Sequence, residues 1–435
     1  MNKEFEVSEA ISKSLFFLGA GFSRDAGCLT SAQMIKDLKR KIIDQDSELS
    51  SVQKEAFKFL FSCLSYHAEW RTMEGGGKFE FFPNIEELAL LIRRVRNRET
   101  FLPYPITGNW ASKLGQLESE YYSEKGEGNL FDSLEEVLKK YLKNEWLSIE
   151  SDEKLLYLKP LSHFFKCFPD QKFRLDIFSL NYDDVIERCF RLVDEIPWRG
   201  FSNGKWVNAE PDIQNDSNTR INLYKLHGSV DWVRLTDMDT WEKSKLLTLE
   251  TDLQDNIVQK QDPYIIFGQG TKSFSVEPFF SLIHYFNSLL KKEDKKYFFV
   301  IGYSFFDPYI NNILFNSLKD FKKLIIINPC FAPQKYFEID PQTEWPKFDK
   351  ENFFRAVFKE GCNESNITDF FRDIQKNSFY SELPEFNYLP SSAQNIFYIP
   401  LTAANFLENF LKNSGELLLK FIHSFEMELA EEEPF

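Results

Sequence analysis

The sequence lacks several patterns that define common classes of protein. Its six cysteines are scattered, and no two are spaced as C-x-x-C, which removes the usual signature of a zinc ribbon or a dithiol redox site. No apolar run is long enough to cross a bilayer, and no apolar segment of signal-peptide type follows the first residues. We therefore expect a cytoplasmic protein with no membrane association and no bound metal.

An excess of positive charge is also missing. The chain has 52 Lys and Arg against 67 Asp and Glu, a net charge of −15, so we expect no direct binding of nucleic acid. Hydrophobic residues make up 43% of the 435 residues, which is ordinary for a globular protein. Phenylalanine is abundant, with 46 copies, and so much aromatic surface favours contacts with subunits or partners.

Short apolar runs without polar alternation predict strands that are buried on both faces, as in a parallel sheet. Six such runs occur, at 15–18, 176–180, 223–226, 264–267, 298–301 and 324–327. Each is followed almost at once by glycine or polar residues. Ligands of open α/β sheets bind at the carboxyl ends of the strands, so we expect all six ends to meet at one pocket. The predicted fold class is α/β, a Rossmann-like parallel sheet with helices on both faces.

The long interval between the first two predicted strands indicates an inserted subdomain, because a crossover needs only a dozen residues or so. Apolar residues at helical spacing predict helices at 32–43, 85–98 and 134–142 and a loop at 72–78. We expect a domain over 1–330 with a mainly helical insertion at about 32–170. An extension over 331–435 would follow, helical at 353–374, irregular at 383–400 and ending in an amphipathic helix. The extension would pack on the domain or in a subunit contact.

The first predicted strand leads into a glycine loop at Gly19 and Gly21. A residue without Cβ lets the backbone approach a phosphate closely. The dehydrogenase pattern G-x-G-x-x-G then requires glycine at position 24, where this chain has Arg24, and a second strand where 33–43 reads as helix. The Walker pattern fails as well, since no G-K-S/T follows. A hydride-transfer enzyme and a P-loop enzyme are both disfavoured.

Five short segments, taken together, resemble one family. Residues 19–27 are similar to the G-A-G-x-S-x-x-x-G opening of sirtuins, and residues 181–183 are similar to their Asn-x-Asp segment. The pair at 227–228 resembles the sirtuin catalytic His-Gly, residues 302–304 resemble a later Gly-x-Ser, and Asn328 ends a strand. The amino-acid sequence around these segments resembles the SIR2-like proteins of bacterial anti-phage defence more closely than it resembles protein deacylases.

The resemblance implies an NAD+ glycohydrolase that cleaves the bond between nicotinamide and ribose. ADP-ribose and nicotinamide would be the products, and NAD would be a substrate. The implied catalytic residues are Asn181 to hold a water, His227 as general base and Asp183 to orient the carboxamide or a loop, with a covalent ribosyl route open. The implied NAD-binding residues are Gly19, Ala20, Gly21, Phe22, Ser23, Gly302, Ser304 and Asn328.

The biological role that the resemblance implies is an effector of abortive infection that depletes NAD. Such an enzyme needs control, so we expect a homo-oligomer and a possible activator: a HerA-type ATPase, an Argonaute-like protein or a phage protein.

Other functions and structural roles remain open. The chain could be a module that senses NAD or an ADP-ribose derivative without hydrolysing it, or a protein deacylase. The deacylase is disfavoured because the four-cysteine zinc module of that group is not assembled here. Asn181 and Asp183 could serve only as caps of a helix that begins near residue 185, and Gly302 only as a turn.

Overall fold

The computed structural model describes most of the chain. The described residues are 9–44, 47–75, 85–97, 102, 106, 108, 110–166, 174–202, 205–211, 220–235, 246–249, 263–265, 277–303, 307–317, 323–328, 337–339, 346–348, 396–399, 401–411, 415, 417–419 and 422. The chain divides into two compact units. The sheet unit comprises Met1–Gly27, Ile149–Leu226 and Phe274–Phe435, and the second unit comprises Cys28–Ser148 and His227–Ser273.

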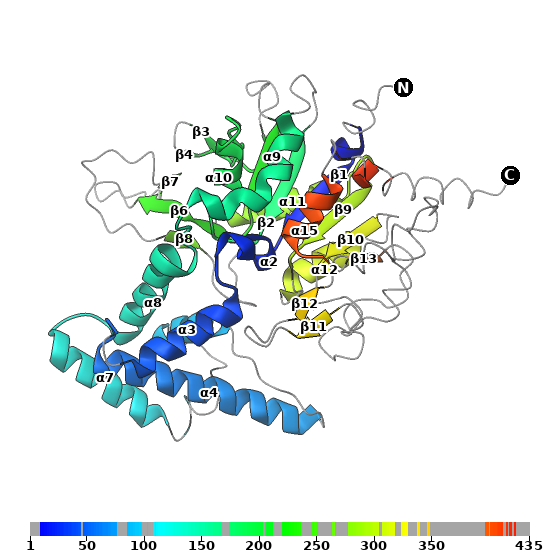
Figure 1. The fold of residues 1–435 in the computed structure, drawn as a ribbon. Coiled ribbons are helices and arrows are strands. Elements are labelled where there is room, and N and C mark those ends of the chain that lie inside the picture. The colour runs from blue at the N-terminus through cyan, green and yellow to red at the C-terminus, as the bar shows by residue number, and fades with distance from the viewer. Residues whose placement is uncertain are drawn as a thin grey trace. The chain divides into compact units, whose positions relative to one another are not determined.

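The centre of the sheet unit is a six-stranded sheet in which every described pairing is parallel (Figure 1). Its strands are β1 (Ser14–Leu18), β2 (Leu175–Ser179), β5 (Ile221–Lys225), β9 (Tyr297–Ile301), β10 (Lys323–Ile327) and β13 (Ile396–Ile399). They lie side by side in the order β13-β10-β9-β1-β2-β5. Numbered along the chain this is the order 3-2-1-4-5-6 of a Rossmann sheet, so the α/β prediction is confirmed.

Helices cover both faces of this sheet, and successive strand residues explain why. Adjacent side chains on a strand point to opposite faces, so Phe16 and Phe17 pack on different helices. Phe17 stacks at 5.6 Å on Phe286 of α11 (Phe279–Leu290). Phe16 stacks on Phe299, which in turn contacts Phe406 of α15 (Ala403–Phe410). Each buried ring contributes roughly 1.5–3 kcal/mol, which makes the two faces the main source of stability in this unit.

The sheet unit has further helices and two small hairpins. They are α2 (Ala20–Ser23), η1 (Arg24–Ala26), η3 (Asp152–Leu158), α9 (Lys159–Lys166), α10 (Val185–Arg191) and α12 (Pro308–Ser317), with antiparallel pairs β3–β4 (Phe201–Ser202, Lys205–Trp206) and β11–β12 (Phe337–Ile339, Pro346–Phe348). Residue 419 and its described neighbours 417, 418 and 422 are helical, where the terminal amphipathic helix is predicted.

The second unit is mainly helical, and the predicted insertion at about 32–170 stays a prediction. Its helices are α3 (Ser31–Ile43), α4 (Ser51–Gly75), α5 (Ile85–Arg96), α7 (Ala111–Lys125), α8 (Leu130–Tyr141) and the π-helical η2 (Leu142–Trp146). The helices predicted at 32–43, 85–98 and 134–142 match α3, α5 and α8. Strands β6 (Gly228–Leu235), β7 (Leu246–Leu249) and β8 (Pro263–Ile265) pair antiparallel in this unit.

Three predictions about individual segments need correction. The strand predicted at 264–267 was assigned to the wrong sheet: its described residues 264 and 265 belong to β8, which pairs antiparallel with β6, because a short apolar run does not specify its partner. The sixth parallel strand is β13, in a segment predicted as irregular. The predicted loop at 72–78 is helical up to residue 75 as the end of α4. The helix predicted at 353–374 lies outside the described residues.

The predicted boundary at residue 330 stays a prediction, although β13 and α15 extend the sheet unit beyond it. Helix α15 begins at a Thr402 cap, whose hydroxyl accepts a hydrogen bond from the amide of Asn405. Its apolar face, with Phe406 and Phe410 buried, lies against the sheet. Residues after 330 therefore contribute both an edge strand and a covering helix to the Rossmann-like core.

Candidate functional site

The order of the strands identifies one edge of the sheet as the place for a ligand. The chain builds the sheet from β1 outward through β2 to β5, then crosses back to β9 and builds outward through β10 to β13. The order therefore reverses between β1 and β9. In open α/β sheets the ligand crevice lies at this reversal, at the carboxyl ends of the strands. The loops that follow β1 and β9 are the glycine segments at 19–21 and at 302.

These two glycine loops pack directly on each other. The amide of Gly21 donates to the carbonyl of Gly302 at 2.9 Å. A Cβ on Gly19 would lie 2.5 Å from Cα of Tyr303, and Gly302 has a φ of +68° with its Cβ position 2.4 Å from the amide nitrogen of Phe22. Residues with side chains therefore do not fit. From the sequence we expected a phosphate to require these glycines, whereas the contact between the two loops already requires them.

The amides of the first loop are largely engaged within the protein. Gly19 donates to Ile301, Gly21 to Gly302 and Phe22 to Gly19. The ring of Phe22 is buried, and its carbonyl accepts a 2.8 Å hydrogen bond from the hydroxyl of Tyr157. Ala20, by contrast, is exposed. Ala20 is thus the most exposed residue of this loop, and Gly21 beside it is half-buried.

Asn181 follows β2 and is held by the first glycine loop. Its Nδ2 donates to the carbonyl of Gly19 at 2.9 Å and to Oγ of Ser23 at 3.0 Å. Because a carbonyl oxygen only accepts, these contacts assign the orientation of the amide: both Nδ2 protons are used. Among the described residues no group donates to Oδ1, although Asn181 is only 7% exposed. The amide oxygen is therefore available to a water or ligand.

Asp183 lies on the same loop and is buried. Its Oδ1 accepts from the amide of Val185 at 3.2 Å, which caps the start of α10, and its carboxyl also bonds to Ser23. Burial raises the pKa of the Asp183 carboxyl, and the charge of Lys225 opposes that shift. The structural role considered for Asp183 in the sequence, a helix cap, is thus present.

A buried cluster of charged side chains lies next to loop 181–183, and we did not predict it from the sequence. Lys225, at the end of β5 and 1% exposed, donates from Nζ to the carbonyls of Asn181, at 3.2 Å, and Asp183. Glu187 Oε1 lies 3.6 Å from this ammonium group and 3.0 Å from Arg199 Nη2. The available signal was a lysine within the otherwise apolar run 223–226, which is unusual unless the charge is paired.

The remaining predicted residues occupy different places. Asn328 is buried and donates from Nδ2 to the carbonyl of Tyr303 at 3.1 Å, so it supports the loop after β9. His227 follows β5 by two residues, is 2% exposed and belongs to the second unit. Ser304 lies outside the described residues. The structure thus brings together Gly19, Gly21, Ser23, Asn181, Asp183, Gly302 and Asn328 at one edge of the sheet unit.

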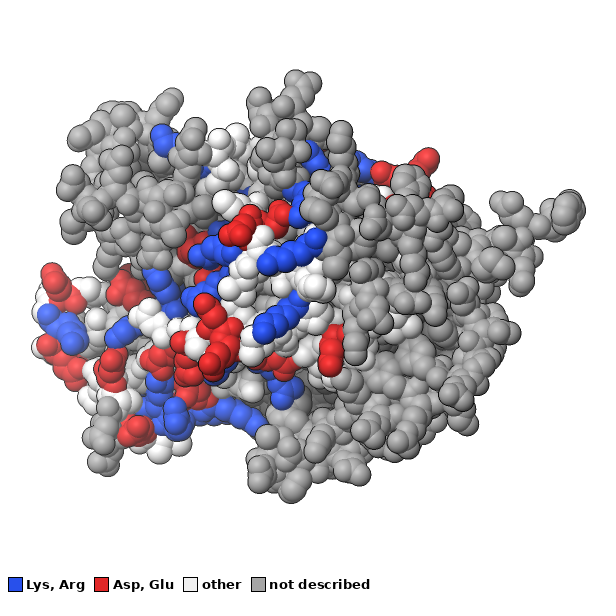
Figure 2. All heavy atoms as spheres, turned by 45° about the horizontal axis from the view of Figure 1, so that its top comes forward, with Lys and Arg blue, Asp and Glu red and all other residues white. Residues whose placement is uncertain are grey.

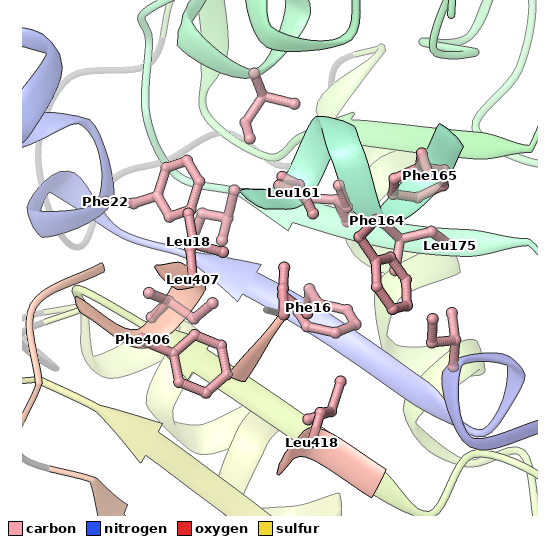
Figure 3. Close-up of a pocket in the computed structure, with 15 residues that line it drawn as sticks. Phe16, Leu18, Phe22, Leu161, Phe164, Phe165, Leu175, Phe406, Leu407 and Leu418 are labelled. Carbon is pink, nitrogen blue, oxygen red and sulfur yellow. The ribbon is translucent and has the colours of Figure 1, made fainter. Parts of the chain in front are cut away.

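An apolar cavity in the sheet unit, lined in part by Phe22 of the first glycine loop, is not a second site. It lies between the sheet, α9 and α15 and measures about 30 Å³ (Figure 3). Its walls include Phe16, Phe164 and Phe406, which point toward one another in the close-up, and all its lining side chains are apolar. A space of this size holds about one water molecule and offers it no polar partner. The cavity is a packing void.

Three features of the described residues concern charge, metal binding and membrane insertion. On the face shown in Figure 2, acidic and basic side chains are interspersed. Within the described ranges, no group of three or more His, Cys, Asp or Glu is placed to hold a metal ion. No described helix has the length and apolar character needed to cross a bilayer.

Comparison with a family model agrees with the sequence motifs. A family model for a SIR2-like domain matches residues 176–357, a range that includes Asn181, Asp183, His227 and Gly302. The chain is similar to a solved structure described as "The Structural basis of Sirtuin Substrate Affinity", with TM-score 0.30, 13% identity and coverage of 80% of this chain and 94% of the other. It is also similar to Sir2Tm bound to a propionylated peptide, with TM-score 0.28, 12% identity and coverage of 80% and 92%. No curated protein matches the chain.

Proposed function

We propose that this chain, whose residues 176–357 match a SIR2-like domain, is an NAD+ glycohydrolase that releases nicotinamide and ADP-ribose. The observation that carries the proposal is the buried amide of Asn181 at the reversal of the strand order. Both its Nδ2 protons are held by Gly19 and Ser23, while Oδ1 is left to accept from a ligand or water. A catalytic group needs this kind of fixed orientation, because an amide free to rotate loses much of its effect.

The reaction requires little covalent help from the protein. The bond between the anomeric carbon and the cationic pyridinium breaks, and nicotinamide leaves as a neutral molecule that keeps the bonding electron pair. Water forms the new bond to the anomeric carbon. Asn181 Oδ1 would accept a hydrogen bond from that water and orient it. The proton that the water loses would pass to His227, since imidazole is the side chain that most often serves as a general base.

The other predicted residues receive supporting roles in this proposal. Asp183 caps α10 and bonds to Ser23, so it would orient the loop of Asn181. Ala20 would meet the diphosphate or ribose at the exposed part of its loop, with Gly302 and Ser304 on the opposite side. Asn328 would act through the loop after β9 that it supports.

The cellular role that we propose is depletion of NAD in an abortive-infection response to phage. The resemblance of the motifs to defence proteins supports this role, together with the need to silence an enzyme that destroys an essential metabolite. Control by homo-oligomerisation or by an activator, such as a HerA-type ATPase, an Argonaute-like protein or a phage protein, belongs to the same proposal.

The test is incubation of the purified full chain with NAD+, alone and with each candidate activator, followed by chromatography of the products. Nicotinamide and ADP-ribose should appear in equal amounts, and the Asn181→Ala and His227→Ala variants should lose at least 100-fold in rate. Asn129→Ala is the matched control, since Asn129 caps α8 in the second unit and its loss should not affect the rate.

Two results would contradict the proposal. Saturable NAD+ binding without nicotinamide release under every condition would identify a sensing module. Release that depends on an acylated peptide would identify a deacylase.

A further inference from the structure

A lysine lies buried beneath the loop that carries Asn181. Lys225 is the last residue of β5, 1% exposed, and its neighbours in the strand are buried side chains. An ammonium group is rarely buried this deeply, because it loses its hydration unless protein groups replace it. What surrounds this group therefore indicates what it does.

The ammonium group of Lys225 has three neighbouring oxygen atoms, two of which accept hydrogen bonds from it. Nζ donates to the carbonyl oxygen of Asn181 at 3.2 Å and to the carbonyl oxygen of Asp183. The third oxygen is Glu187 Oε1, at 3.6 Å, and Glu187 sits on α10 directly after this loop. Lys225 thus ties together both ends of loop 181–183 and the helix that follows.

Asn181 is consequently held at two points. Its side chain is fixed from above by Gly19 and Ser23, and its main-chain carbonyl is fixed by Lys225. The orientation of the peptide group after Asn181 affects the position of its Cα and Cβ. By holding the carbonyl of this peptide, Lys225 therefore restricts the positions that Oδ1 can take. Small displacements of a catalytic group cost large factors in rate.

We propose that Lys225 is a positioning residue for Asn181: it aligns the amide oxygen for the attacking water without touching the substrate. This inference rests on the proposed NAD+ hydrolysis. Lys225 would then contribute to the reaction in addition to the three predicted catalytic residues. Its replacement should lower kcat and change KM little.

The chain supplies a matched control for a merely structural role. Lys295 is also buried in the sheet unit, at 8% exposure, and also donates to a backbone carbonyl, that of Ser12 at 2.7 Å. Its carboxylate partner is Asp176, with 3.1 Å between the charged atoms. Lys295 precedes β9, so it lies at the amino end of the strands, away from the glycine loops.

The experiment compares Lys225→Met with Lys295→Met in the full chain. Both changes keep a long unbranched side chain, one atom shorter than that of lysine, and remove its charge. Amide hydrogen exchange, kcat and KM are measured for each. We expect the amides of Asn181 and Val185 to exchange at least tenfold faster in Lys225→Met only. We also expect kcat of Lys225→Met to fall at least tenfold, with KM within threefold of wild type. Lys295→Met should keep the wild-type kcat and KM.

Equal exchange at these amides in the two variants, or equal kcat, would overturn the inference. Should Lys225→Met fail to fold, Lys225→Gln, which keeps a donor but no charge, must show the same pattern or the inference is wrong. The exchange measurement does not depend on catalysis. Wild-type protein that never releases nicotinamide would therefore defeat the proposed function, while faster exchange confined to Lys225→Met would still show that the lysine holds the loop.

Discussion

The amide nitrogen of Gly21 donates a 2.9 Å hydrogen bond to the carbonyl oxygen of Gly302. This contact joins the loop after β1 to the loop after β9, the two strands between which the order of the sheet reverses. The floor of the candidate site is therefore made of backbone on backbone. Its shape depends on the absence of side chains at Gly19, Gly21 and Gly302.

The first prediction follows from that contact. Gly302→Ala should destabilise the protein by about 2 kcal/mol or more, because the left-handed φ of +68° is unfavourable for alanine and the new Cβ would lie 2.4 Å from the amide nitrogen of Phe22. Urea unfolding followed by circular dichroism measures the change.

The control for this prediction is Gly115→Ala. Gly115 lies inside α7, and nothing approaches within 4 Å of its Cβ position. Alanine should stabilise the helix there by about 0.5–1 kcal/mol. A Gly302→Ala protein as stable as wild type would mean that the two loops do not pack as described.

The second prediction concerns the pH dependence of stability. Burial raises the pKa of Asp183 above the ordinary value of 3.8, so the unfolded carboxyl releases its proton at a lower pH than the folded one. Between the two pKa values the unfolded chain binds fewer protons, and the free energy of unfolding falls as pH rises. This contribution levels off above the folded pKa.

Asp183→Asn removes the titrating group but keeps one oxygen that can accept from the amide of Val185. The difference in unfolding free energy between the variant and wild type should therefore shift in favour of the variant as pH rises from 3.8. Urea titrations at several pH values measure it. Parallel stability curves for the two proteins would show that the buried carboxyl is not desolvated.

The third prediction compares two phenylalanines of α11. Phe286 is fully buried against Phe17 and Phe178, with ring centroids at 5.6 and 4.6 Å, so Phe286→Ala should cost about 3–5 kcal/mol of stability. Phe280 on the same helix is 55% exposed, and Phe280→Ala should change stability by less than about 0.5 kcal/mol. Similar thermal midpoints for the two variants would contradict the assignment of this sheet face to α11.

Much of the fold follows from local patterns. The runs at 15–18, 176–180, 223–226, 298–301 and 324–327 became β1, β2, β5, β9 and β10, because continuous apolar character is a property of the strand itself. The same is true of α3, α5 and α8, whose apolar faces repeat with the helical period. The motif residues Gly19, Asn181 and Gly302 were also visible, since each directly follows such a run.

Pairing partners could not be read in the same way. The run at 264–267 and the segment at 396–399 show that local apolarity does not choose between a parallel edge and an antiparallel hairpin. That choice depends on contacts between residues far apart in the chain, which no local pattern contains.

By itself, the sequence determined five of the six parallel strands, where glycine is needed and which polar residues stand at the ends of those strands. Only the tertiary structure decided three further features. It showed that β13 completes the sheet, that the two glycine loops pack on each other, and that Lys225 donates a hydrogen bond to the carbonyl of Asn181. The physical reason is the separation in sequence of the residues involved. The hydrophobic pattern that predicts burial and secondary structure lies within one segment, whereas the partner of a buried carbonyl or charge depends on how segments distant in the chain pack together.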